Sequence, residues 1–389
     1  MEWKEVLLSE FLEFNPKRII KKNEVARKIT MDLLIPHSKQ IYSFKYEPYT
    51  GGAKFSNGDT IMARITPCLE NGKHAYVSCL NEGEIAYGST EYIVLCGKNG
   101  VSDNEFVYYL SHTPQFVNTA IKSMVGSSGR QRAQVPVLEN LIMSVPVNLS
   151  DQRKIAGILS ALDAKIENNN KINANLEAQA EALFKSWFVD FTPFKDQPFV
   201  DSELGPIPQG WKVGTLFDVA NLHDRYRRPL SSNQRSLMAK KYPYYGATSL
   251  MDFVEDYIFD GEYVLMGEDG SVVTEKGYPF IQYVWGKIWV NNHAHVLSGK
   301  DGFPTELLIP FLKTYNIKGL VTGAVQAKLN QANMAQIQIP IPPKKNINNL
   351  SVIIKSIYKK YRLLTEENQR LAALRDTLLP KLMSGEIKL

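Results

Sequence analysis

Apolar residues recur every three or four positions along two segments, which run from Asp151 to Val189 and from Asn346 to Met383; the first has no proline and the second has one, Pro380, near its end. This alternation is the a/d pattern of a coiled coil, and helices of such length span roughly 57 Å at 1.5 Å per residue. The stripes are narrow and too long for one small domain to cover, so we expect the two helices to cover each other as a rod-like spacer. The alternative is that each helix packs only on its own domain. The predicted helix-pair interface consists of Ile155, Leu159, Leu162, Ile166, Asn173, Leu176, Leu183, Leu350, Ile354, Ile357, Asn368, Leu371 and Leu378.

Two asparagines interrupt these stripes near the middle of each helix. Asn173 and Asn368 are 195 residues apart, the same offset that relates Leu176 to Leu371. A polar residue at one core position costs stability but fixes the register of a helix pair. We therefore predict that the two amides meet across the pair.

Outside the helices, short alternating apolar runs broken by Gly, Asn and Pro indicate strands and turns. Their order occurs twice along the chain. Trp3-Lys4 recurs as Trp211-Lys212, Gly58 aligns with Gly261 at an offset of 203, and Glu91 aligns with His293 at an offset of 202. Several matches in the same order predict an internal duplication; the alternative is chance similarity between two unrelated α/β domains.

The pattern predicts an α+β protein with two tandem α/β domains related by this repeat. The predicted segments are a first domain (1–150), a central long helix (151–190), a Pro-rich linker (191–210), a second domain (211–343) and a C-terminal long helix (344–389).

Composition narrows the class of protein. The 389 residues include 45 Lys and Arg against 40 Asp and Glu, a formal charge of +5, with 44% hydrophobic and 22% charged residues. Such a chain can bury ordinary cores, and its mild charge means that any nucleic-acid surface must come from local clustering. Three cysteines without Cys-x-x-Cys spacing, no signal-like start and no apolar run of about 20 residues favour a cytoplasmic protein.

Basic residues cluster at matching places in the two copies, and each copy has a small-residue loop near the end of its mixed segment. Glycines allow close backbone approach to phosphates, while Arg and Gln make bidentate contacts with base edges. One such cluster is usually a solvated surface, but two at equivalent positions favour DNA binding. The predicted DNA-binding residues are Lys17, Arg18, Lys21, Lys22, Arg64, Arg130, Gln131 and Arg132 in copy one, and Arg225, Arg227, Arg228, Arg235, Gln326 and Lys328 in copy two.

Motifs for catalysis are missing from the sequence. There is no Walker loop, no Gly-x-Ser-x-Gly elbow, no zinc-protease helix and no Asn/Asp-Pro-Pro-Tyr tetrapeptide of the kind found in amino-methyltransferases. His293-x-His295 puts two imidazoles on one strand face, but no third ligand is suggested nearby, so a satisfied polar strand face is favoured over a metal site. We predict no catalytic residue and no metal site.

Several segments resemble the specificity subunit of Type I restriction-modification systems, and the likeness covers almost the whole chain. The most specific are Gly58 to Pro67, which contains Arg64; Gly88 to Tyr92; Gly126 to Arg132; Tyr245 to Thr248; Asp151 to Ala156; and Leu378 to Gly385. One departure is that the second helix opens Lys344-Lys345-Asn346 without the acidic-Gln pair seen as Asp151-Gln152.

The resemblance implies two target-recognition domains separated by two long antiparallel helices, each domain reading one half of a split double-stranded DNA site. It also implies that the helices dock two methyltransferase subunits, through which restriction/translocase subunits join. S-adenosylmethionine, ATP and Mg²⁺ would then belong to these partners, with no cofactor in this chain. Two other classes stay open: a restriction protein with its own methyltransferase or nuclease centre, and a protein-binding coiled-coil scaffold.

Overall fold

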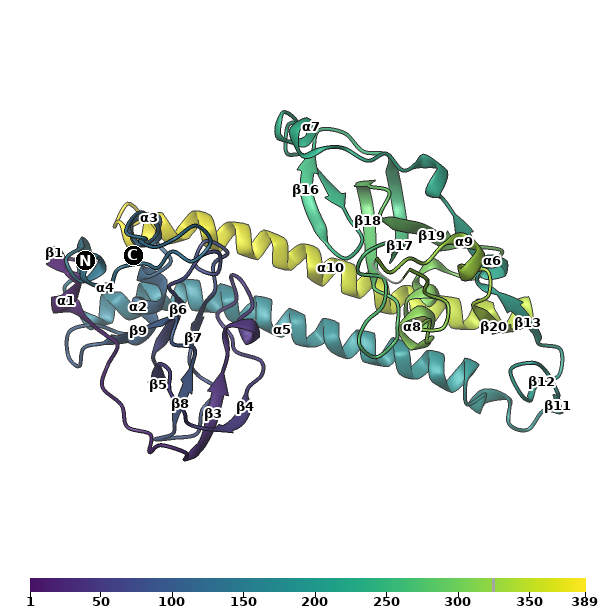
Figure 1. Cartoon of the computed structure of the whole chain (residues 1–389), viewed down its shortest axis with the longest axis horizontal. Coiled ribbons are helices and arrows are strands. Elements are labelled where there is room, and N and C mark those ends of the chain that lie inside the picture. Colours follow the sequence, from purple (N-terminus) through teal and green to yellow (C-terminus); the bar gives the residue numbers. More distant parts are fainter. Residues whose placement is uncertain (324–325) are drawn as a thin grey trace. The chain divides into compact units, whose positions relative to one another are not determined.

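Both long helices are present, and each is a single helix of 40 residues (Figure 1). They are α5 (Leu149–Phe188) and α10 (Lys344–Met383). The computed structural model describes residues 1–323 and 326–389 and divides into two compact units. The first unit contains residues 1–170 and 365–389, and the second contains residues 171–364. Each unit therefore includes part of both helices, whereas the sequence had suggested domains and helices as separate segments.

The first unit is built from small sheets, antiparallel except for the parallel β3–β8 pair, and short helices around α5 and α10. Strands β2, β9, β6 and β7 form one sheet in that order, β4, β3, β8 and β5 form another, and β1 pairs with β10. The strands are β1 (Trp3–Leu7), β2 (Leu12–Phe14), β3 (Val25–Ile29), β4 (Lys45–Pro48), β5 (Lys54–Ser56), β6 (Thr60–Ala63), β7 (His74–Tyr76), β8 (Ile85–Gly88), β9 (Tyr92–Gly97) and β10 (Ile142–Pro146). The short helices are α1 (Leu8–Phe11), α2 (Asn104–Leu110), α3 (Pro114–Lys122), α4 (Val135–Glu139) and the 3₁₀ turn η1 (Met31–Leu33).

The second unit has one larger sheet in the order β14-β19-β17-β18-β15-β16, and the pairs β13–β20 and β11–β12. Its strands are β11 (Phe199–Val200), β12 (Ile207–Pro208), β13 (Lys212–Thr215), β14 (Ala220–Leu222), β15 (Tyr242–Tyr245), β16 (Leu250–Val254), β17 (Phe259–Gly267), β18 (Ile281–Val290), β19 (Ala294–Gly299) and β20 (Gln338–Ile341). The helices are α6 (Leu216–Val219), α7 (Ser232–Ser236), α8 (Thr305–Thr314), α9 (Gln331–Met334) and the 3₁₀ turns η2 (Thr192–Phe194) and η3 (Asp224–Tyr226).

The duplication is visible in the strand order, since β2-β9-β6-β7 and β14-β19-β17-β18 correspond strand by strand. Register refines the sequence alignment. Ala63 lies opposite Tyr92 and Gly267 opposite Ala294, so if Tyr92 corresponds to Ala294, then Ala63 corresponds to Gly267 at an offset of 204. At this offset Gly58 corresponds to Glu262, one residue beyond the Gly261 of the sequence alignment.

Within the first unit the two helices pair antiparallel through polar groups. The Asn169 side-chain amide donates to Asn368 Oδ1 at 2.9 Å and to Glu367 Oε2 at 2.8 Å, and the Asn368 amide donates to Asn170 Oδ1 at 2.8 Å. Asn173 is buried in the second unit, one turn further along α5 than Asn169, so a meeting of Asn173 with Asn368 of the first unit stays a prediction.

Arg375, a charged residue within the apolar stripe of α10, takes part in a buried ion pair. Arg375 Nη1 lies 2.6 Å from Asp163 Oδ1, and the Tyr109 hydroxyl donates to Asp163 Oδ2 at 2.6 Å. The Asp163 and Arg375 side chains are 8% and 15% exposed, so water screens this pair little. Nearby Asp163 raises the pKa of Arg375 despite its burial, and both burial and Asp163 raise the pKa of Tyr109. Arg375 is therefore a specific partner of the first helix.

Each unit completes its core with residues from both helices. In the first unit, Ile155 and Leu159 of α5 and Leu382 of α10 pack in one cluster with Phe11 and Phe106. In the second unit, the corresponding cluster takes Ala180, Phe184 and Phe188 from α5 and Leu350, Ile354 and Tyr358 from α10. The long stripes are thus buried partly by each other and partly by the small domains.

The first turn of each long helix is anchored differently. The Gln152 side chain is fully buried; its amide donates to the carbonyls of Val101 and Pro146 at 3.0 Å, and its oxygen accepts from the Asp103 backbone N–H at 2.8 Å. Offset by 195, the same place in α10 is taken by Ile347, which is buried in the apolar core of the second unit. An apolar anchor in α10 thus replaces the polar one that the acidic-Gln pair supplies in α5.

Residues 191–210, predicted as a stiff linker, pack onto the second unit. Phe194 and Ile207 are buried, and the ring of Phe194 lies 5.1 Å from that of Trp211. The prolines here set up the short β11–β12 pair, in which Phe199 lies opposite Pro208. No helix in the described part of the chain is long and apolar enough to cross a membrane.

We predict that Arg375→Met lowers the free energy of unfolding by about 3–5 kcal/mol, because it leaves the Asp163 carboxylate buried without its cation. The double variant Asp163→Leu/Arg375→Met should recover most of this loss. As a control, Asp376→Asn should change stability by less than ~1 kcal/mol, since the Asp376 side chain is 66% exposed. Urea unfolding of the full chain measures all three variants; an unchanged Arg375→Met would contradict this role.

Candidate nucleic-acid interface

The two predicted reading loops occupy equivalent places in the two units. In the first, the Thr66 N–H donates to the Gln131 carbonyl at 3.0 Å and the Ala133 N–H to the Arg64 carbonyl at 2.8 Å. In the second, Gly270 N–H donates to Ala327 at 3.0 Å and Leu329 N–H to Glu268 at 2.8 Å. The same backbone frame thus makes Arg130 equivalent to Gln326, and Arg132 to Lys328. Two residues of the second loop, Ala324 and Val325, lie outside the described residues.

The two loop glycines are required by the backbone conformation of the loops, a role that the sequence alone did not indicate. Gly323 has φ +94°, and a Cβ on it would lie 2.1 Å from the Gln326 carbonyl oxygen. Gly126 has φ +139°, and a Cβ there would lie 2.9 Å from the Arg130 oxygen. Each glycine lets the loop close on its own backbone. Close approach to phosphate, the reason given for these glycines from the sequence, stays a prediction.

Arg132 is held in place by an acid from a neighbouring strand end. Its guanidinium donates to both oxygens of Glu91 at 2.7–3.0 Å, a bidentate pair, and the Arg132 side chain is 42% exposed. Hydrogen bonding to Arg132 lowers the pKa of Glu91 although burial opposes it. Arg64 also contacts the end of this loop, since its Nη2 donates to the Ala133 carbonyl at 3.2 Å. Arg130, by contrast, is exposed and has no carboxylate within 4.0 Å among the described residues, and Gln131 is half-buried.

The first basic cluster divides into one paired and three unpaired cations. Arg18 Nη2 lies 2.6 Å from the Asp59 carboxylate, which is 1% exposed. Burial raises the pKa of Asp59, and Arg18 opposes that shift. Lys17, Lys21 and Lys22 are exposed, and no ion pair within 4.0 Å is found for their side chains among the described residues. The structure gives Arg18 a role in holding β6, and a phosphate contact for it stays a prediction.

The second basic cluster divides in the same way. The Arg225 guanidinium lies 4.6 Å over the Tyr226 ring on the surface, and Arg228 is exposed. Arg235 Nε lies 3.1 Å from Asp252 Oδ2, and its guanidinium lies over the ring of Tyr244. These positions leave Arg225 and Arg228 as the cations of this cluster that are most free to meet a ligand.

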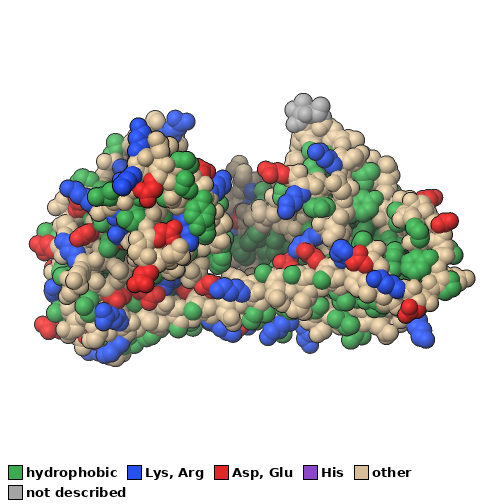
Figure 2. Space-filling model, turned by 90° about the horizontal axis from the view of Figure 1, so that it is seen from below, with side chains coloured by type: hydrophobic (Ala, Val, Ile, Leu, Met, Phe, Trp, Pro, Cys, Tyr) green, Lys and Arg blue, Asp and Glu red, His purple; other side chains and the backbone are tan. Residues whose placement is uncertain are grey.

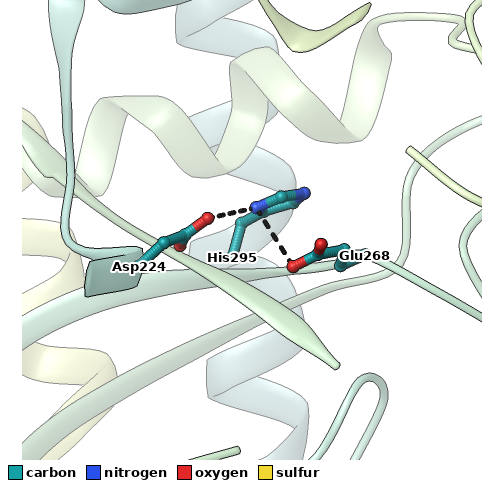
Figure 3. Close-up of side chains that lie close together, drawn as sticks. All are labelled: Asp224, Glu268 and His295. Carbon is teal, nitrogen blue, oxygen red and sulfur yellow. Dashed lines mark hydrogen bonds and ion pairs between the residues drawn. The ribbon is translucent and has the colours of Figure 1, made fainter. Parts of the chain in front are cut away.

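Arg227 belongs to a compact charge cluster with Asp224, Glu268 and His295. Its Nη1 lies 2.6 Å from Glu268 and its Nη2 3.2 Å from Asp224. His295, fully buried on β19, places Nδ1 2.6 Å from Asp224 Oδ2 and 3.7 Å from Glu268 Oε2 (Figure 3). Burial raises the pKa of Asp224, but its bonds with His295, the Val296 N–H and Arg227 outweigh this and leave that pKa lowered.

Ligand atoms of Asp224, Glu268 and His295 lie within 4.8 Å of one another, a spacing that could hold a metal ion. The Arg227 guanidinium already bonds both carboxylates, and His295 Nε2 is directed at the Leu329 carbonyl at 2.7 Å. A cation would have to displace these bonds, so the arrangement favours an ion-pair cluster. His293 was expected to share a face with His295, but it is exposed and bonds to Asp269. Residue spacing did not indicate that these side chains meet, because Asp224 and Glu268 come from other elements than His295.

Charge is mixed on the face of the molecule that Figure 2 draws. Figure 2 shows lysine and arginine side chains interspersed with acidic ones on the face it draws, with no single continuous basic area. This agrees with a formal charge of only +5. Any attraction to a phosphate chain must therefore come from a few local cations.

These features define a protein with two copies of one loop-bearing α/β domain and two long helices shared between them. The chain matches the family described as Type I restriction modification DNA specificity domain over residues 1–178 and 208–373, and it belongs to that family. Both the resemblance and the fold class drawn from the sequence are confirmed.

Curated relatives of the chain are specificity subunits. A putative type I restriction enzyme specificity subunit of Haemophilus influenzae is 39% identical over 148 residues, which cover 38% of this chain and 37% of that protein. The MjaIX specificity subunit of Methanocaldococcus jannaschii is 27% identical over 75% of this chain and 70% of its own length, and the HindI subunit of H. influenzae is 23% identical over 90% of each chain.

One solved structure has the same fold. The crystal structure of a Type-I restriction-modification system S subunit from M. genitalium covers 98% of this chain and 96% of its own, with a TM-score of 0.54 and 17% identity. At that identity the likeness supports the fold only.

We predict that the unpaired cations carry the salt dependence of DNA binding. Arg228→Ala should weaken binding to all sequences alike and reduce the slope of log affinity against log salt by about 0.9. Arg227→Ala should instead destabilise the second unit, because it leaves Asp224 and Glu268 without their cation. When only folded protein is compared, this variant should change the slope of log affinity against log salt little. Titrations at several salt concentrations, together with thermal unfolding, separate the two. Equal slopes for Arg228→Ala and the unchanged chain would contradict the phosphate assignment.

Proposed function

We propose that this chain reads an asymmetric, two-part DNA site and does no chemistry itself. The observation that carries the proposal is the pair of equivalent loops on one backbone frame, bearing different side chains at matching positions, Arg130 against Gln326. Arg pairs best with guanine and Gln with adenine in the major groove. Two readers of the same build but different chemistry suit a site whose two halves differ in sequence.

We further propose that partner subunits supply the chemistry. Two methyltransferase subunits would dock on the long helices, and restriction/translocase subunits would join through them. S-adenosylmethionine, ATP and Mg²⁺ would be bound by those partners, and the methylated base would be adenine. Support for docking comes from Val352, Leu363 and Leu374, which recur every 11 residues, close to three turns of α10, and are 71%, 50% and 47% exposed.

The two alternative functions have distinct signatures. A restriction protein with its own centre would methylate or cut DNA when the purified chain is incubated with S-adenosylmethionine and Mg²⁺; we expect neither activity. A protein-binding scaffold would show no sequence preference in a DNA selection carried out with the methyltransferase present. Mapping methylated adenines in cells that express the whole system tests the proposal most directly, and a single, unsplit site would overturn it.

We predict that Arg130→Ala and Gln326→Ala each relax recognition in one half of the mapped site and leave the other half unchanged. Losing one bidentate base contact costs roughly 1–3 kcal/mol of discrimination at the contacted position. Both side chains sit on exposed loops, so folding should be unaffected. Methylation maps of the two variants, compared with Lys22→Ala as a phosphate-type control, show the effect. Relaxation of both halves by one substitution would contradict the assignment of one loop to each half.

A further inference from the structure

The two most exposed large apolar side chains among the described residues lie at corresponding places in the two units. Ile19 is 83% exposed and Leu237 is 88% exposed. Ile19 lies between β2 and β3, and Leu237 lies between β14 and β15. These connections correspond, because β2 and β14 pair with β9 and β19, while β3 and β15 each pair in parallel with the preceding strand, β8 or β18. A single exposed aliphatic residue is ordinary, but two at one place in a repeated fold indicate a shared use.

The segment that carries Leu237 is held firmly on both sides. It follows the short helix α7, which begins with a capping box (Figure 1). Arg235 Nε lies 3.1 Å from Asp252, and Lys240 Nζ donates to the Arg235 carbonyl and to Asp252, each at 2.8 Å. Met238, the next residue, packs against a small cluster of buried residues. Leu237 is therefore presented to solvent by a fixed segment.

The segment that carries Ile19 is held in a similar way. Arg18 lies 2.6 Å from the buried carboxylate of Asp59, and Ile20 is only 7% exposed. Both units thus place an anchored arginine shortly before the exposed aliphatic residue and a packed apolar residue directly after it. We call Ile19 and Leu237 the apolar tips of the first and the second unit.

Two lysines follow each apolar tip. They are Lys21-Lys22 in the first unit and Lys240-Lys241 in the second, and all four are exposed. Packing such a tip into the apolar surface of a partner protein would bury these charges, which is costly. In a DNA groove the lysines can instead lie against phosphates while the apolar side chain meets the bases. The charge around the tips therefore favours duplex DNA as their partner.

Strand length sets how far the apolar tip of the first unit lies from the reading loop. Arg18 bonds Asp59 just before β6, and Arg64 bonds the loop just after β6. From Asp59 to Arg64 the chain makes five steps through β6, which at about 3.3 Å each span roughly 17 Å. One turn of B-DNA spans about 34 Å, so major and minor grooves alternate about every 17 Å along one face. A loop in the major groove therefore puts the tip at the adjacent minor groove.

The second unit has the same arrangement. β15 begins shortly after Leu237, and near its other end Tyr245 lies opposite Val290, the last residue of β18. The chain then reaches His293, whose carbonyl accepts from the Glu268 N–H at 2.9 Å. Glu268 in turn supports the reading loop through its own carbonyl. Leu237 and the loop thus lie toward opposite ends of β15.

We propose that Ile19 and Leu237 are minor-groove wedges, each inserted between two base pairs beside the half-site that its own unit reads. Apolar side chains used in this way partly unstack a base step and bend the duplex toward the major groove. Steps that unstack easily, such as TA and CA/TG, suit them best. Each tip therefore adds a sequence preference at a step that the reading loop does not contact. The inference rests on the proposed function, because it takes each unit to bind one half-site.

The first test measures affinity of the full chain, assembled with its methyltransferase subunits, for the mapped duplex. Leu237→Ala should weaken binding about 10- to 50-fold, because three carbon atoms leave the base stack. Leu237→Met keeps an apolar wedge and should retain most of the affinity. Leu204→Ala is the matched control, since it truncates a leucine that is 41% exposed elsewhere in the second unit, and it should have no effect. Unchanged affinity of Leu237→Ala would overturn the proposal.

Salt dependence separates the tip from its lysines. Leu237→Ala removes no charge, so it should weaken binding equally at every salt concentration and leave the slope of log affinity against log salt unchanged. Lys241→Ala should instead reduce that slope by about 0.9. The thermal midpoint of the free chain should stay the same in both variants, because both side chains are exposed. A slope that falls in Leu237→Ala would show a displaced lysine and would overturn the wedge.

Modified bases identify the groove. Diaminopurine in place of adenine adds an amino group in the minor groove only, and uracil in place of thymine removes a methyl group from the major groove only. Diaminopurine at the wedge step should weaken binding of the unchanged chain and have little effect on Leu237→Ala. A uracil effect that disappears in Leu237→Ala would overturn the minor-groove placement in favour of a contact with a thymine methyl group. Energy transfer between labelled duplex ends should show a smaller bend with Leu237→Ala, and an equal bend would contradict the wedge.

Two outcomes separate failure of this inference from failure of the proposed function. If methylation mapping shows no split site, the proposed function fails. If the site is split but Ile19→Ala and Leu237→Ala both bind like the unchanged chain, only the wedge fails. Loss of methyltransferase subunits from the purified Leu237→Ala complex in the absence of DNA would overturn the wedge in favour of a protein contact.

Discussion

The whole structure depends on burying two apolar stripes that are each longer than any domain in the chain. A helix of 40 residues cannot hide its apolar face under one small α/β domain, and exposed in water such a face is unfavourable. The chain meets this constraint by giving each unit part of both helices. Leu382, near the C-terminal end of α10, completes a core that begins with Val6, and Phe188 of α5 packs in a core with Leu350. The first unit is thus not a continuous stretch of sequence, since the last 25 residues belong to the fold of the first 170.

The same constraint explains why the seam contains specific polar pairs. Two polar pairs, Asp163–Arg375 and Asn169–Asn368, fix the register of the helix pair. Apolar spacing alone would leave the two helices free to shift by one turn. Under the repeat, Asp163 corresponds to Tyr358 and Arg375 to Ala180, both buried in the other unit. The two ends of the seam therefore differ chemically, one ionic and one apolar. A helix paired with a copy of itself would bury an unmatched charge, so the seam favours pairing between α5 and α10.

Periodicity was enough to predict the helices, the repeat and the succession of strands, because these features depend on local residue patterns that both copies retain. It could not predict which cations are free. Arg18, Arg132 and Arg227 looked like phosphate ligands beside Lys21 and Arg228, yet each has a carboxylate partner 41 residues away in the chain. Those partners lie on or next to neighbouring strands, so only the folded sheet brings them close. The repeat likewise fixes which residues are equivalent, whereas the antiparallel register fixes which ones meet, and it places Asn169 beside Asn368.

Comparison of the two copies shows what duplication has preserved at the reading loops. The residue after the central strand is Arg64 in one copy and Glu268 in the other, and the residue before the next strand is Glu91 in one and His293 in the other. Charge is reversed at the first position, and at the second an acid is replaced by a histidine. The loop cation nevertheless keeps an acidic neighbour, since Arg132 pairs with Glu91, while Lys328 lies 4.0 Å from Glu268. The acid has moved to the other position, and a side chain bonds the carbonyl behind each loop, Arg64 in one copy and His295 in the other. The two copies therefore share the support of the loop, whereas the exposed side chains on it differ.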